Sequence, residues 1–233
     1  MRLSDQMGKR ILFFDGGMGT LLQSRGLGAG ELPEPWNLTH PDRVAHIQAS
    51  YRAAGADILK TNTFGANSVK LAGSGWDAKP IVAAAVAIAR KAAGDGLVAM
   101  DIGPTGKLLK PLGDLDFEQA YDAFAQAAVE GERAGADLIL IETMNDTYEC
   151  KAAVLAAKQN TRLPVFVTLL VDGNGRLMTG GDIPCAVAML EGLGVDAVGL
   201  NCGAGPKQML MLLPQLTAAA SVPIVVNPNA GLS

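Results

Sequence analysis

One pattern occurs three times in this chain and constrains its fold more than any other feature. In each copy a helical stretch ends at a glycine, an aspartate follows two residues later, and a short apolar strand comes next. The three copies are AAGADILKTN (53–62), RAGADLILIET (133–143) and GLGVDAVGLNC (192–202). Glycine readily adopts the left-handed conformation that ends a helix. A repeated turn from helix to strand predicts repeated β/α units around a parallel sheet.

Apolar runs between the helical patterns extend this alternation along the chain. They predict seven strands, at residues 11–15, 57–61, 97–101, 137–142, 165–171, 196–201 and 222–226. No linker interrupts them, which predicts a single domain over residues 1–233. No G-x-G-x-x-G sequence follows the first strand, as a dinucleotide-binding fold would have. We therefore expect an α/β fold of the (β/α)8 TIM-barrel type that lacks the eighth strand and its C-terminal elements.

Composition narrows the range of functions. The 233 residues are 49% hydrophobic and carry a formal net charge of −4, which argues against nucleic-acid binding. The N-terminus has no apolar signal core and no 18-residue apolar span is present, so a cytoplasmic protein without membrane contact is predicted. Three cysteines at distant positions argue against a disulfide framework.

Helix starts can be read from capping residues. Asp116 with Gln119, Asp146 with Glu149, and Thr39 with Asp42 each have the spacing of an N-terminal cap. Other residues are interpreted without a function. Cys150 and Cys185 fall in helical stretches and are expected to be small packing residues. His40 and His46 are expected at the surface or as caps, and Trp36 either roofs a site or anchors its loop.

Polar residues gather where the predicted strands end, which is the face of a β/α barrel that carries active sites. They are Asp15, Thr61, Asn62, Asp101, Glu142, Thr143, Asn201 and Cys202. The set is slightly acidic and contains no lysine or arginine, so it suits a small ligand with an ammonium group better than a phosphate-rich one. Any one carboxylate here also has a plain structural interpretation, as a cap for the next helix or an acceptor for loop amides.

Six segments, in this order along almost the whole chain, carry a family resemblance. They are DGGMGT (15–20), GADILKTNTFGAN (55–67), DIGPTGKLLKPLGDL (101–115), LIETMND (140–146), GLNCGAGP (199–206) and PNAGL (228–232). Together they resemble the homocysteine S-methyltransferase family, and within it the homocysteine-binding barrels of cobalamin-dependent methionine synthases. The resemblance implies zinc-dependent methyl transfer to the thiol of homocysteine, which gives methionine.

The resemblance also assigns roles to positions. Cys202 matches the first of three cysteine ligands of a catalytic zinc ion, and two further cysteines are expected beyond residue 233. The positions matched to the amino-acid part of homocysteine are Asp15, Gly16, Thr61 and Glu142, with Asn201 shaping the site. A thiol bound to zinc is deprotonated and becomes a nucleophile at neutral pH. Glu142 is the natural partner of the substrate ammonium.

The resemblance implies methylcobalamin as methyl donor, with corrinoid- and folate-binding domains as partners; relatives use betaine or S-methylmethionine. One thiolate does not hold a catalytic zinc, so this chain alone is expected to be inactive. Three explanations for the missing eighth strand and its cysteine pair are considered. The chain is cut short of a longer parent, its missing part comes from another chain, or it is a degenerate member that has lost methyl transfer. The first is favoured. Two alternative functions stay open. One is a zinc-free barrel that binds an amino acid without turnover, and the other is an enzyme that uses Asp15 and Glu142 as acid and base.

Overall fold

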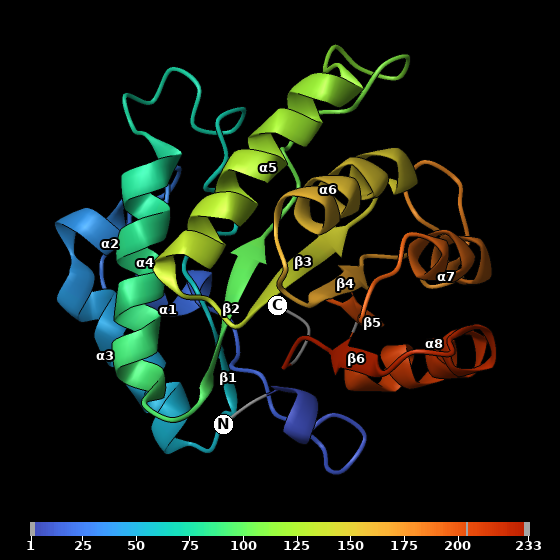
Figure 1. Cartoon of the computed structure of the whole chain (residues 1–233), viewed down its shortest axis with the longest axis horizontal. Helices are drawn as coiled ribbons and strands as arrows, with labels where there is room; N and C mark the ends of the chain where they lie inside the picture. Colours follow the sequence, from blue (N-terminus) through green and yellow to red (C-terminus); the bar gives the residue numbers. More distant parts are fainter. Residues whose placement is uncertain (1–2, 204, 231–233) are drawn as a thin grey trace.

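The computed structural model describes residues 3–203 and 205–230, and its centre is one parallel sheet. The strands are β1 (Ile58–Lys60), β2 (Leu97–Ile102), β3 (Leu138–Met144), β4 (Val165–Leu169), β5 (Ala197–Asn201) and β6 (Ile224–Asn227). They lie side by side in sequence order, and each pairs in parallel with the next. The sheet curls, with helices on its outer side, as in a barrel that is not closed (Figure 1).

Helices alternate with the strands, as the repeated pattern predicts. A 3-10 turn, Leu3–Asp5, comes first among the described residues. The α-helices are α1 (Gly19–Gln23), α2 (Trp36–Thr39), α3 (Pro41–Ala53), α4 (Ala78–Ala93), α5 (Phe117–Ala134), α6 (Thr147–Asn160), α7 (Ile183–Gly192) and α8 (Pro206–Ala219). In the part of the chain that the structure describes, none of them is both long and apolar enough to cross a bilayer.

The predicted first strand, 11–15, is wrong as a strand. This segment lies along β1 but pairs with it through a single parallel bridge, Phe14 to Ile58. The Asp15 N–H donates to the Ile58 carbonyl at 3.0 Å. Ile11 and Phe13 are 76% and 61% exposed, so the segment has too little packing on its outer side to form a full strand. The other six predicted strands correspond to β1–β6, with ends that differ by up to two residues.

The aspartate of the repeated pattern explains why the pattern recurs. In each copy its carboxylate accepts an N–H from the preceding strand segment and pairs with a cation. The three sets are Asp57 with Phe13 N and Arg10, Asp137 with Val98 N and Arg90, and Asp196 with Val165 N and Lys158. The glycines before them have φ angles of 102°, 99° and 77°. Each copy therefore ends a helix and fixes the start of a strand against its neighbour.

Two of the three predicted helix starts are confirmed. Asp116 and Gln119 form a reciprocal capping box, and Asp146 accepts the N–H groups of the first turn of α6. The third is wrong, because α3 is preceded by His40 rather than Thr39 and has no side-chain cap. Pro41 begins that helix, and its ring fixes the required φ angle without a capping hydrogen bond.

The inner face of the sheet changes character along the strands. Near the strand starts it is apolar, with Ile58, Ala99, Leu140 and Phe166 in one buried cluster that also contains Leu3. Alternate residues of a strand point to the same face. The next inward positions therefore belong to Lys60, Asp101, Glu142 and Thr168, and the interior becomes polar toward the carboxyl ends of the strands.

Candidate functional site

Four ionisable side chains meet inside the curled sheet and form what we call the interior polar cluster: Asp15, Lys60, Asp101 and Glu142. The three carboxylic residues are 3%, 5% and 7% exposed. Each predicted carboxylate is therefore in the site. The prediction that the site lacks lysine is wrong, because Lys60 follows Ile58 on the inward face of β1. The sequence DILKT contained the information, because residues two apart on a strand, such as Ile58 and Lys60, point to the same face.

The ammonium group of Lys60 is bonded to Glu142. Its Nζ donates to the two carboxylate oxygens at 3.3 and 3.2 Å, and the two side chains are only 11% and 10% exposed. Although burial by itself lowers the pKa of Lys60, the attraction of Glu142, Asp101 and Asp15 outweighs it and the pKa is raised. Lys60 is thus a firmly held cation and not a nucleophilic amine.

Asp15 is held by the backbone of β1 but is only partly satisfied. Its Oδ2 accepts the Lys60 N–H at 3.0 Å, while its buried Oδ1 has no hydrogen-bond partner in the described structure. Burial raises the pKa of Asp15 from 3.8 to about 7, against the attraction of Lys60. Burial and the neighbouring Glu142 likewise raise the pKa of Asp101 well above its usual range. Asp101 Oδ1 also lacks a described partner.

The turn after Asp15 needs glycine at its first position. A Cβ atom on Gly16 would lie 2.7 Å from the Tyr51 hydroxyl oxygen, which is closer than Cβ atoms in proteins approach other heavy atoms. That hydroxyl donates to the Gly17 carbonyl at 2.9 Å and so fixes the turn. Gly16 therefore brings the backbone of the DGGMGT segment close to α3, beside the interior polar cluster.

Cys202 stands at the end of β5, beside a clamped pair of side chains. Asn201 accepts the Thr143 N–H at 3.1 Å and donates to Thr143 Oγ1 at 2.8 Å. Its amide nitrogen also lies 3.5 Å from the Cys202 sulfur. Thr143 and Cys202 have φ angles of 64° and 55°, which residues other than glycine rarely adopt. Such strain persists only where surrounding contacts enforce it, and it is common at functional sites.

The Cys202 thiol is within electrostatic reach of the interior polar cluster. It is half-buried, and burial raises its pKa, with contributions from Glu142 and Asp101 that act in the same direction and from Lys60 that opposes them. The isolated thiol is therefore protonated at neutral pH, and a cation beside the sulfur would be needed to make it a thiolate.

Two predicted members do not join the cluster through their side chains. Thr61 Oγ1 is hydrogen-bonded to Thr63, accepts the Asp101 N–H at 3.0 Å and lies near the sulfur of Met100. Met100 belongs to the core between sheet and helices, so this hydroxyl points outward. Asn62 donates to the Pro33 carbonyl at 2.8 Å and fastens the loop before α2.

The residues interpreted without a function lie mostly as expected. Cys150 is buried in the core that α6 forms with the sheet. Cys185 is exposed near the start of α7, so its predicted packing role is wrong. Trp36 is 2% exposed and donates to Glu31, which makes it an anchor of its segment. His40 and His46 lie on the α2–α3 surface.

The described residues do not by themselves form the zinc site that the resemblance implies. Within residues 3–203 and 205–230 no group of three or more histidine, cysteine, aspartate or glutamate side chains is arranged to hold a metal ion. Cys202 is the one described cysteine near the cluster, since the other two lie on α6 and α7. A catalytic zinc needs three protein ligands.

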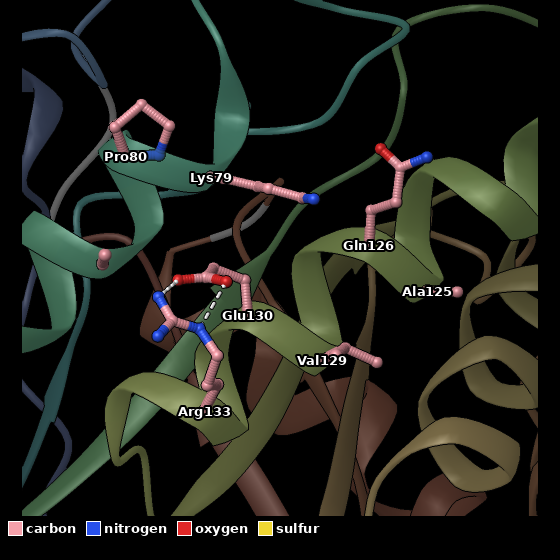
Figure 2. Close-up of a pocket in the computed structure, with 8 residues that line it drawn as sticks. Lys79, Pro80, Ala125, Gln126, Val129, Glu130 and Arg133 are labelled. Carbon is pink, nitrogen blue, oxygen red and sulfur yellow. Dashed lines mark hydrogen bonds and ion pairs between the residues drawn. The ribbon is translucent and has the colours of Figure 1, made fainter.

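A groove on the outer surface has no part in this site. It lies between α4 and α5 and is lined by Lys79, Gln126 and the Glu130–Arg133 ion pair (Figure 2). None of the residues at the carboxyl ends of the strands reaches it. It is a surface feature of the helix layer and does not lead into the interior of the sheet.

The raised pKa of Asp15 predicts a pH-dependent stability. Between pH 4 and 7 the folded protein keeps a proton that the unfolded chain has lost, so stability falls as pH rises. Asp15→Asn removes this titration. Its free energy of unfolding relative to wild type should increase by up to about 4 kcal/mol from pH 4 to above pH 7. Urea unfolding at several pH values measures the difference.

Asp122→Asn is the control, because Asp122 is an exposed carboxylate of α5. It should leave the pH profile of stability as in wild type. A constant difference between Asp15→Asn and wild type over this range would contradict the assignment of a high pKa to Asp15.

The fold and the site define a class: a parallel β/α half-barrel with a buried acidic cluster and one thiol at the carboxyl ends of its strands. Comparison with known proteins places it further. The family model described as homocysteine S-methyltransferase matches residues 12–233, and the chain belongs to this family.

Two groups of relatives illustrate the match. The chain is 36% identical to the methionine synthases of Mycobacterium tuberculosis and Mycobacterium leprae, over 99% of its own length but only 21% of theirs. The homocysteine methyltransferase MmuM of Escherichia coli, in its metallated form, is 26% identical and superposes with a TM-score of 0.84. That alignment covers 96% of this chain and 85% of MmuM. The carboxyl transferase domain of Rhizobium etli pyruvate carboxylase, at 18% identity, shares the fold alone.

Proposed function

We propose that this chain binds homocysteine and takes part in transfer of a methyl group to its thiol, with methionine as product. The observation that carries the proposal is the half-buried Cys202 within electrostatic reach of the buried Asp101 and Glu142. Homocysteine bears an ammonium group at one end and a thiol at the other. The acidic cluster matches the first group, and the surroundings of Cys202 match the second.

In this proposal the chain's residues divide the substrate between them. Asp15 and Asp101 each have a buried carboxylate oxygen without a described partner, and an ammonium group would satisfy both oxygens. Glu142 adds charge, and Gly16 lets backbone amides approach the amino-acid part. Asn201 fixes the backbone on which Cys202 sits. Thr61 is assigned a supporting role, because its hydroxyl orders the Asp101 backbone.

We further propose that Cys202 is one ligand of a zinc ion, whose other two cysteine ligands lie beyond residue 233. Zinc would hold the substrate sulfur as a thiolate. Methylcobalamin is the proposed donor, bound by a corrinoid-binding domain, with a folate-binding domain as a further partner. The small share of the mycobacterial methionine synthases that the chain spans is consistent with such additional domains. We propose the cytoplasm as its location.

The proposal is tested by offering the full-length protein homocysteine with methylcobalamin, S-methylmethionine or betaine and measuring methionine. Methionine formed with methylcobalamin supports the proposal as stated. Methionine formed with one of the other two donors keeps methyl transfer and overturns the donor. Calorimetric titration of homocysteine separates the remaining outcomes: binding without product with any donor indicates an amino-acid-binding barrel, and no binding overturns the proposal.

A further inference from the structure

Lys60 is the charged residue of the site that the proposed function does not use. It is also unusual among the cations of this chain. In the other ion pairs of the described residues the cation's side chain is 31–69% exposed, whereas that of Lys60 is 11% exposed. Burying an ammonium group is costly unless it is paired, so a position inside the sheet needs a compensating role or partner.

The interior polar cluster holds more carboxyl groups than ammonium groups. Three carboxylic groups face this one ammonium, and only Glu142 hydrogen-bonds it through its side chain. Asp15 Oδ1 and Asp101 Oδ1 are buried and without described partners. Buried polar atoms are rarely left without a hydrogen bond, so these two oxygens are free to accept hydrogen bonds from a second cation that comes with a ligand.

A second cation in the cluster would change the surroundings of Lys60. An ammonium group that binds the carboxylates shares Glu142 with Lys60, and two like charges then compete for one partner. A ligand that carries a carboxylate on the carbon next to its ammonium restores the balance. The ammonium group takes the aspartates and Glu142, and the carboxylate takes Lys60. A simple amine offers no such replacement.

We infer that Lys60 binds the α-carboxylate of the substrate and makes the site selective for zwitterionic amino acids over simple amines. Lys60 is held by Glu142 in the free protein and exchanges part of that bond for the carboxylate of the ligand. Because the inference rests on the proposed function, its test compares homocysteine with two analogues. One is γ-mercaptobutyrate, which lacks the amino group, and the other is mercaptopropylamine, which lacks the carboxylate.

The experiment measures the affinity of wild type and Lys60→Met for the three thiols by calorimetric titration under reducing conditions. Lys60→Met should lower the affinity for homocysteine by about ten- to a hundredfold, because a charge-assisted hydrogen bond is lost. It should lower the affinity for γ-mercaptobutyrate by a similar factor. Mercaptopropylamine should bind Lys60→Met at least as tightly as it binds wild type, because Lys60 no longer competes for Glu142.

An equal change for all three ligands, or unchanged homocysteine binding, overturns the role of Lys60 while leaving the proposed function intact. If wild type binds none of the three, the proposed function and the inference fall together. Should Lys60→Met fail to fold, the comparison is made between Glu142→Gln and Lys60→Met/Glu142→Gln. The double variant removes both charges of the buried pair. A selective loss of γ-mercaptobutyrate in the double variant supports the inference, and equal binding of it by both variants contradicts it.

Discussion

Replacing Cys202 with serine in the full-length protein is expected to lower kcat/KM for methyl transfer to homocysteine by on the order of a thousandfold. The reason is the loss of one thiolate from the proposed zinc site, since a metal ion contributes several kcal/mol by stabilising charge on the reacting atom. Bound zinc should fall in parallel. Activity is measured as methionine formed, and metal content by mass spectrometry of the purified variant.

Cys185→Ser is the matched control. Cys185 is exposed at the start of α7, away from the interior polar cluster, and its replacement should change neither activity nor metal content. Thermal unfolding of both variants separates a local effect from loss of the fold. A Cys202→Ser variant that keeps its zinc and its activity would show that Cys202 is not a ligand.

Replacing Glu142 with leucine should cost about 3–5 kcal/mol of the free energy of unfolding, because it leaves the ammonium of Lys60 buried without its hydrogen-bonded partner. The double variant Lys60→Met/Glu142→Leu should recover most of this loss. Two apolar side chains of similar size often replace a buried ion pair with little penalty. Urea unfolding of the two single variants and the double variant gives the coupling energy directly.

Lys158→Met provides the comparison for a more exposed pair. Lys158 and Asp196 are 32% and 40% exposed, so the loss should be at most about 1 kcal/mol. If Glu142→Leu costs no more than Lys158→Met, then Asp15 and Asp101 have taken over the charge of Lys60. The Lys60–Glu142 pair would in that case not be an essential buried contact.

Much of the fold could be predicted because the signals are local. The glycine and aspartate of each repeated copy act on backbone groups within a few residues or on the adjacent strand, and six of the seven predicted strands are present. The failures have physical causes that sequence does not display. Ile11 and Phe13 look like strand residues but are exposed, and the turn before α3 uses proline where a capping side chain was expected.

The candidate site could be predicted in part. Strand ends identify Asp15, Asp101, Glu142 and Cys202, because parallel strands bring their carboxyl ends to one edge. Which side chains point inward is a separate matter. Lys60 and Thr61 are neighbours in sequence, yet the Thr61 hydroxyl faces the helix layer and the Lys60 ammonium faces the interior.

The sequence by itself determined the repeated β/α architecture, the family and the presence of one thiol among several carboxylates at the strand ends. Only the tertiary structure decided that Lys60 stands among those carboxylates and is bonded to Glu142, 82 residues away along the chain. The register between neighbouring strands sets which inward side chains meet, and burial sets the strength and pKa values of the charges that do. Both depend on the whole sheet, so no local stretch of sequence specifies them.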